Sequence, residues 1–138
     1  MATIKERIEV LGRVPLFESL PKHQLRKLAN LAKEVEHSAG HSVVEEGHLG
    51  LGFHIILTGK AKVIVGGRTR RVLEAGDFFG ELALIDQGLR SATVTVTEPS
   101  MLLFLPGFGF RTLVQGDSAL CFKLLVYVTQ RLRDAEKR

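Results

Sequence analysis

Glycine recurs through residues 40–107 and divides this stretch into short segments with the character of β-strands. Residues 53–57 are apolar apart from His54, and residues 92–97 alternate between apolar side chains and threonine, the pattern of a half-buried strand. Gly66-Gly67 stands between two such segments and is a strong signal for a two-residue hairpin. Many short strands with closely spaced turns predict a sandwich or a jelly roll. The expected strands are residues 42–45, 53–57, 61–65, 72–73, 92–97 and 101–105.

The residues before this stretch have helical spacing. Thr3 and Glu6 form a possible capping box for a short helix that ends near Gly12. A second helix is expected after Ser19, because its apolar side chains recur on one face. That face consists of Leu25, Leu28, Ala29, Ala32 and Val35.

The residues after Pro106 are also expected to be helical. Residues 108–114 predict one short helix, and Asp117 or Ser118 can cap a longer one. The last residues, 131–138, are polar, and we expect them to fray. The apolar face of the longer helix is Cys121, Leu124, Leu125, Val128 and Leu132, widened by Phe122 and Val126.

These patterns together predict an α+β fold, in which an antiparallel β-roll (jelly-roll-like) is flanked by N-terminal and C-terminal helices. A chain of 138 residues is long enough to bury a core and has the size of one domain. We therefore expect a single domain over residues 1–138. Its parts would be N-terminal helices in residues 1–39, the β-roll in residues 40–105 and C-terminal helices in residues 106–138.

Composition narrows the function classes. The hydrophobic fraction of 45% and charged fraction of 25% are typical of a soluble globular protein. No apolar run approaches the roughly 18 residues that a membrane span needs, and the first residues lack a secretory signal, so we expect no membrane span and a cytoplasmic protein. The single Cys121 excludes an internal disulfide, and its apolar helix face predicts a buried, inert thiol. A net charge of +4 favours an anionic ligand but is too diffuse to indicate nucleic acid.

Residues 78–94 contain the side chains that could form a binding site. Gly80 allows a tight turn and the close approach of a ligand, and a helical turn opening at Glu81 would present backbone N–H groups to an anion. Arg90 could form a bidentate pair with a phosphate, and the Glu81 carboxylate would suit a hydroxyl group beside it. This combination describes a pocket for a sugar phosphate. Each feature alone also has a plain structural explanation, with Gly-Glu-Leu-Ala in an ordinary helix and Arg90 as a surface charge at a strand edge.

The order of these residues resembles the phosphate-binding cassette of the cyclic nucleotide-binding domain family. The first half of the cassette reads Phe79-Gly80-Glu81-Leu82-Ala83-Leu84, and after a spacer the second half reads Arg90-Ser91-Ala92-Thr93-Val94. The resemblance covers roughly residues 14–135 and implies the same order of helices, β-roll and helices. The chain departs from it at His54, where many members have tyrosine, and in residues 49–52, which lack the usual acidic residue.

The resemblance implies a role for each cassette residue. Backbone N–H groups around Leu82 and Ala83 would hold the cyclic phosphate, and Arg90 would pair with its exocyclic oxygen. Glu81 would accept a hydrogen bond from the ribose 2′-hydroxyl, aided by the backbone near Gly80. The implied ligand is cAMP or cGMP, with no cofactor and no metal.

The resemblance says less about the base. Ser91 would add a hydroxyl to the phosphate or the base, and serine directly after the arginine favours cAMP, with cGMP still possible. In the family a residue of the C-terminal helix often caps the base, and Tyr127, Arg131 and Arg133 are the candidates here. The alternatives are core packing for Tyr127 and a solvated helix end for the two arginines.

We expect the chain to be a regulatory module that signals by moving its C-terminal helix when a cyclic nucleotide binds. The broad apolar face of that helix also fits a homodimer contact or an effector domain. The alternative is therefore a dimerisation or partner-binding module whose cassette is vestigial or binds another anion.

Two other classes are disfavoured. A cupin-type metal enzyme needs a His-x-His pair, which is absent, and no serine or cysteine nucleophile motif occurs, so we expect no catalysis. A transcription factor of the catabolite activator type would need a helix-turn-helix, for which residues 136–138 leave no room. The cluster of Arg68, Arg70 and Arg71 is expected to be a solvated hairpin tip, so we expect no nucleic-acid binding by this chain alone.

Overall fold

The computed structural model describes residues 1–86 and 88–137 of the chain. The chain divides into two compact units. The first, here called the β-roll unit, consists of residues 32–109, and the second, the helical unit, consists of residues 1–31 together with 110–138. The assignment of residues 1–138 to a single domain stays a prediction.

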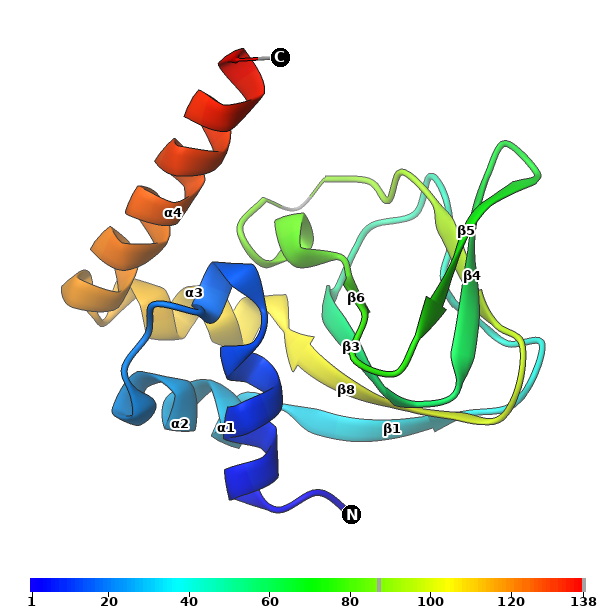
Figure 1. Cartoon of the computed structure of the whole chain (residues 1–138), viewed down its shortest axis with the longest axis horizontal. Coiled ribbons are helices and arrows are strands. Elements are labelled where there is room, and N and C mark those ends of the chain that lie inside the picture. The colour runs from blue at the N-terminus through cyan, green and yellow to red at the C-terminus, as the bar shows by residue number, and fades with distance from the viewer. Residues whose placement is uncertain (87, 138) are drawn as a thin grey trace. The chain divides into compact units, whose positions relative to one another are not determined.

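The β-roll unit contains two antiparallel sheets, as the strand pattern predicts (Figure 1). In the described residues the first sheet has the strand order β1-β8-β3-β6 and the second the order β2-β7-β4-β5. The strands are β1 (Lys33–His37), β2 (Ser42–Val44), β3 (Gly52–Thr58), β4 (Lys60–Val65), β5 (Arg68–Glu74), β6 (Phe78–Phe79), β7 (Thr93–Val96) and β8 (Ser100–Pro106). The predicted antiparallel β-roll is therefore confirmed.

Local sequence explains the hairpin between β4 and β5, whose tip projects from the rest of the roll in Figure 1. Gly66 and Gly67 have φ angles of 58° and 78°, the left-handed values that a two-residue type I′ turn requires at both positions. Only glycine, and less readily Asn or Asp, adopts such angles at low cost. The expected hairpin is therefore confirmed.

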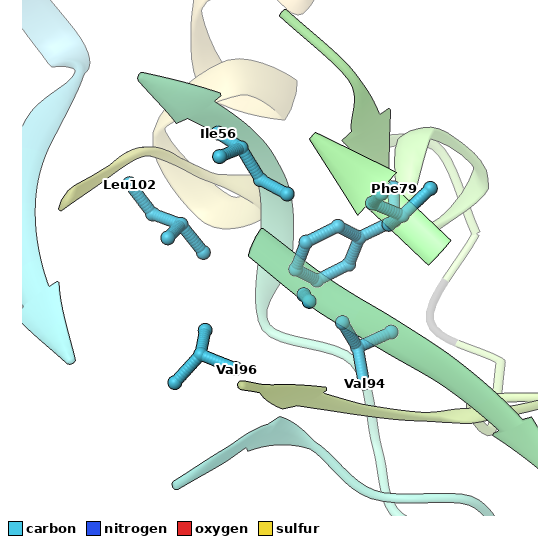
Figure 2. Close-up of a cluster of buried hydrophobic side chains, with 7 residues drawn as sticks. Ile56, Phe79, Val94, Val96 and Leu102 are labelled. Atoms are coloured by element: carbon cyan, nitrogen blue, oxygen red, sulfur yellow. The ribbon is translucent and has the colours of Figure 1, made fainter. Parts of the chain in front are cut away.

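The core of the roll lies between its two sheets. Val94 and Val96 of β7 are 3% and 0% exposed, and threonines occupy the alternate positions, as expected of a half-buried strand. Figure 2 shows the Phe79 ring reaching from β6 into the middle of this cluster. The buried members of the cluster are Ile56, Ala61, Leu73, Phe79, Val94, Val96 and Leu102.

The helical unit begins with the predicted capping box, in which the Thr3 hydroxyl accepts from the Glu6 N–H and the Glu6 carboxylate accepts from the Thr3 N–H. Asp117 caps the last helix by accepting from the Leu120 N–H at 3.0 Å. Among the described residues, no helix combines the length and apolar character that a bilayer crossing requires. The helical segments are α1 (Ile4–Gly12), η1 (Pro15–Phe17), α2 (Lys22–Leu31), α3 (Gly107–Gln115), which starts in the β-roll unit, and α4 (Ser118–Glu136).

Three local predictions were wrong. The apolar face expected to continue α2 through Val35 ends at Leu31, because residues 33–37 form β1 and Val35 pairs with Leu102 of β8. Cys121, expected to be buried, is exposed, because Leu120 and Leu124 form the buried face of α4 instead. The segment expected to fray from residue 131 is helical as far as Glu136.

Candidate functional site

A cavity of about 440 Å³ opens in the β-roll unit around the predicted cassette. Its size lies within the usual range for a small-molecule site. Five of the six predicted ligand-binding residues line it, and the sixth, Leu82, has a side chain outside the described part of the structure. The five are Gly80, Glu81, Ala83, Arg90 and Ser91.

Arg90 is the central cation of this cavity. Its guanidinium donates from Nη2 to the carbonyl oxygen of Gly52 through a short hydrogen bond. Its Nε is buried and has no hydrogen-bond partner among the residues that the structure describes. Burial lowers the pKa of the Arg90 guanidinium, although arginine remains charged at neutral pH. Arg90 is thus a partly buried charge that faces a cavity, and the alternative of a strand-edge surface charge is wrong.

Two glycines, Gly50 and Gly80, make room for the Arg90 guanidinium, and the carbonyl of a third, Gly52, holds it. A Cβ at Gly80 would collide with Nη1, and the φ of +84° at Gly80 is a left-handed value that glycine adopts readily. A Cβ at Gly50 would lie 2.8 Å from the Arg90 Cζ and 2.9 Å from the Ala83 Cβ. Gly52 supplies the carbonyl acceptor. We refer to Gly50, Gly52 and Gly80 as the glycine cradle.

The helical turn after Gly80 is the 3-10 segment η2 (Glu81–Leu84). The Ala83 N–H already donates to the Gly80 carbonyl at 3.1 Å. The expectation that this amide points freely outward is therefore wrong for Ala83, because a 3-10 turn pairs residue i with residue i+3. An anion at η2 would have to share or replace that hydrogen bond.

Arg71 of β5 lines the same cavity, although its cluster was expected to be a solvated hairpin tip. The β4–β5 ladder pairs Val65 with Arg68 and Ile64 with Thr69, and then shifts so that Val63 pairs with Arg71. Such a bulge changes which side chains share a face. No signal in the sequence locates the bulge, so Arg71 was missed. Phe78 and Asp86 also line the cavity and were not predicted.

His54, where the chain departs from the family pattern, is buried between rings. It is 8% exposed and stacks on Phe79 with the ring centroids 4.8 Å apart and the planes 12° apart. Phe104 lies 5.0 Å away on a tilted plane. Burial, with further contributions from the positive charges of Arg90 and His37, lowers the pKa of His54 to about 3. The ring is therefore neutral at physiological pH.

The low pKa of His54 makes stability depend on pH. In the unfolded chain histidine titrates near 6.5, so below that pH His54 is protonated in the unfolded state but stays neutral in the folded state. The stabilising effect is complete above pH 6.5 and is lost as the pH falls toward 3. We expect a loss of about 2 kcal/mol between pH 7.5 and pH 5 from this residue. Urea unfolding at the two pH values measures this loss of stability. His54→Phe, which keeps a ring stacked on Phe79 but cannot titrate, is the comparison. An equal pH dependence in both proteins would contradict this prediction.

The three candidates for capping the base lie on α4, in the helical unit, whereas the cavity belongs to the β-roll unit. The Arg131 Nη1 donates to the Tyr127 hydroxyl at 3.2 Å, and its Cζ lies 5.9 Å from the Tyr127 ring centroid. Arg133 is exposed in the last turn of α4. The assignment of a base cap stays a prediction.

Metal chemistry finds no support in the described residues, where no group of three or more His, Cys, Asp or Glu side chains could hold an ion. His37 and His41 do stack, with centroids 5.0 Å apart. The cavity is instead lined by the guanidinium groups of Arg71 and Arg90, which suit an anion, and by the carboxylates of Glu81 and Asp86, which suit hydroxyl groups.

Comparison with known proteins agrees with this chemistry. The model of one protein family, the cyclic nucleotide-binding domain, matches residues 34–117. A cAMP-dependent protein kinase regulatory subunit from Schizosaccharomyces pombe is 42% identical over 86 residues, which are 62% of this chain and 21% of that protein. A cGMP-dependent protein kinase from Toxoplasma gondii is 40% identical over 93 residues, 67% of this chain and 9% of that protein. The chain thus spans about a fifth or less of the length of these two relatives.

A solved structure extends the similarity over most of the chain. The N-terminal domain of a transcriptional regulator from Streptomyces coelicolor A3(2) superposes with a TM-score of 0.84 and 28% sequence identity, covering 93% of each chain. The residues matched by the family model include the complete lining of the cavity.

Proposed function

The chain belongs to the cyclic nucleotide-binding domain family, and from that premise we propose that it is a non-catalytic regulatory module that binds cAMP in preference to cGMP. The ligand occupies the cavity around Arg90 and leaves chemically unchanged. We further propose that the module acts in the cytoplasm.

The state of Arg90 is the observation that carries this proposal. A guanidinium has five N–H donors in a planar fork that matches the oxygens of a phosphate. The Arg90 Nη2 donates to the Gly52 carbonyl, and Nε is buried without a partner among the described residues. A singly charged cyclic phosphate in the cavity would accept from this fork and neutralise the partly buried charge.

The other cassette residues surround the same ligand. Glu81 accepts from the ribose 2′-hydroxyl, and the backbone near Gly80 helps to position the sugar. The amides of Leu82 and Ala83 turn to the cyclic phosphate, which requires the Ala83 N–H to exchange the Gly80 carbonyl for a phosphate oxygen. Ser91, exposed at the cavity wall, adds a hydroxyl to the phosphate or the base.

The preference for cAMP rests on Ser91, the residue directly after Arg90, and is the finer part of the proposal. The names of the two relatives above include both a cAMP-dependent and a cGMP-dependent protein, so the names alone do not decide. Calorimetric titration of the full chain with each nucleotide is the test. We expect a Kd in the micromolar range or tighter for cAMP, and weaker binding of cGMP. Absence of heat with either nucleotide, in a protein shown to be folded, would overturn the proposal.

Signalling requires that the ligand favours one position of α4. We propose that Tyr127, Arg131 or Arg133 caps the base, so that the bound state holds α4 over the ligand. Amide hydrogen exchange of residues 106–135 should then slow when cAMP is added, relative to the hairpin tip at residues 66–67. Identical exchange with and without the nucleotide would rule out the movement while leaving binding intact.

A second candidate function has one specific observation in its favour. Five large apolar side chains of α4 are exposed, which suits a second copy of the chain or an effector domain. In this reading the chain is a dimerisation or partner-binding module, and the cassette is vestigial or takes another anion. The side chains are Phe122, Leu125, Val126, Val128 and Leu132. Sedimentation analysis of the chain, with and without cAMP, distinguishes self-association that needs the nucleotide from self-association that does not.

A further inference from the structure

The loop that follows β2, residues 45–49, lies beside the second half of the cassette. Val44 of β2 pairs with Val94 of β7. Beyond the end of β2, Leu49 forms a bridge with Leu89. The same number of residues separates these two pairs on both segments, so the loop and the cassette run antiparallel and in register. We refer to residues 45–49 as the cassette-side loop.

Two backbone hydrogen bonds join the cassette-side loop to Arg90. The Gly47 N–H donates to the Arg90 carbonyl at 2.9 Å, and the Arg90 N–H donates to the His48 carbonyl at 2.7 Å. The loop therefore holds both polar groups of the Arg90 main chain. Because the side chain extends from this main chain, the position of the loop affects the direction in which the guanidinium enters the cavity.

The Thr93 side chain attaches the loop to β7. Its hydroxyl accepts a hydrogen bond from the Glu46 N–H at 2.9 Å. Glu46 directly precedes Gly47, so this bond fixes the part of the loop that holds the Arg90 main chain. The Glu46 carboxylate also accepts from the Gly66 N–H at 3.0 Å, which attaches the same residue to the turn between β4 and β5.

Thr93 and Glu46 do not line the cavity around Arg90, although the structure describes both of them. An effect of either residue on a bound ligand must therefore act through Arg90. We propose that Thr93 and Glu46 are positioning residues, which hold the cassette-side loop against Arg90 and so orient its guanidinium toward a cyclic phosphate. The proposal rests on the function proposed above, because an oriented guanidinium affects affinity only if the cavity binds an anion.

Replacing Thr93 by valine tests the role of its hydroxyl. Thr93→Val removes the acceptor oxygen while keeping the size and branching of the side chain, and should weaken cAMP binding by about three- to tenfold, the effect of one lost hydrogen bond. Thr93→Ser retains the hydroxyl and should bind within about twofold of the parent chain. Calorimetric titration of the full chain measures both. Unchanged affinity in Thr93→Val, or no recovery in Thr93→Ser, would overturn the proposal.

Thr95→Val is the matched control. Thr95 lies two residues further along β7, on the same face of the strand, and is half-buried like Thr93. Its hydroxyl forms a hydrogen bond of 3.0 Å with the Ser42 hydroxyl of β2 and does not contact the cassette-side loop. Thr95→Val should therefore leave the cAMP affinity unchanged, and urea unfolding of both variants measures any loss of stability. Equal losses of affinity in Thr93→Val and Thr95→Val would show that the stability of the sheet matters and the position of Arg90 does not.

The Glu46 carboxylate is tested by two variants of equal charge. Glu46→Gln keeps an acceptor oxygen for the Gly66 N–H, and Glu46→Ala removes it. Because both replacements remove one negative charge, their difference reports on the hydrogen bond alone. Glu46→Ala should bind cAMP about threefold more weakly than Glu46→Gln. Equal affinities would exclude the carboxylate from the positioning of Arg90.

Hydrogen exchange without nucleotide separates this proposal from the proposed function. The amides of Gly47 and Arg90 should exchange faster in Thr93→Val than in the parent chain, and at the parent rate in Thr95→Val. If the parent chain does not bind cAMP, the proposed function fails, and these two amides still decide whether Thr93 fixes the loop. Unchanged exchange at both amides in Thr93→Val would overturn the positioning role.

Discussion

Replacing Arg90 by alanine should reduce the affinity for cAMP by about 30-fold to several thousandfold. Removing one partner of a buried, hydrogen-bonded charge pair costs about 2 to 5 kcal/mol, and each 1.4 kcal/mol is a factor of ten in Kd. Arg90→Lys should recover only part of this loss, because an ammonium group cannot form the bidentate pair. Calorimetric titration of both variants measures the effect.

The matched control for Arg90→Ala is Arg70→Ala, which removes the same charge from an exposed position of β5 that does not line the cavity. It should change the affinity by less than about fivefold, the effect of an exposed charge. Similar losses in the two variants would mean that the net charge of the roll, and not the position of Arg90, attracts the nucleotide. Circular dichroism must first show that both variants are folded.

Replacing Phe79 by alanine should lower the free energy of unfolding by about 3 to 5 kcal/mol. The Phe79 ring is 8% exposed, packs in the core cluster between the two sheets and stacks on His54 (Figure 2). Its removal would leave a cavity in a region where the neighbouring strands are fixed by their ladders. Urea denaturation followed by circular dichroism measures the change.

Phe108→Ala provides the comparison, because Phe108 is 78% exposed and its truncation should change stability by no more than about 0.5 kcal/mol. An effect of Phe79→Ala as small as that of Phe108→Ala would show that the cluster does not stabilise the roll. Binding of cAMP should also weaken in Phe79→Ala, because Phe79 lines the nucleotide cavity and precedes Gly80.

The features that could be predicted from the sequence are those fixed by near neighbours in the chain. The Thr3–Glu6 capping box, the Asp117 cap and the Gly66-Gly67 turn each depend on a few adjacent residues with distinct backbone preferences. The cassette could also be recognised from the sequence, because its residues are contiguous on each side of a short spacer. Most of them line one cavity.

The features that escaped prediction depend on contacts between distant segments. The place of Arg71 in the cavity follows from a bulge opposite Val63, which is a property of the β4–β5 pair and not of either strand. The apolar spacing that predicts the second helix continues into residues 33–37. These residues form β1 instead, because they pair with the edge of β8. The position of His54 among aromatic rings likewise depends on Phe79 and Phe104, which lie 25 and 50 residues further along the chain.

The glycine cradle also has an entropic consequence. A free arginine side chain loses about 2 kcal/mol of rotamer freedom when it is fixed in one geometry. Because the Gly52 carbonyl holds the Arg90 guanidinium in the space beside Gly50 and Gly80, this loss has already occurred before a ligand arrives. The arriving phosphate meets a preorganised fork, and more of its interaction energy remains as affinity. The three glycines thus raise affinity without side chains of their own. Alanine at any of them should therefore weaken binding, even if the new methyl group does not contact the ligand.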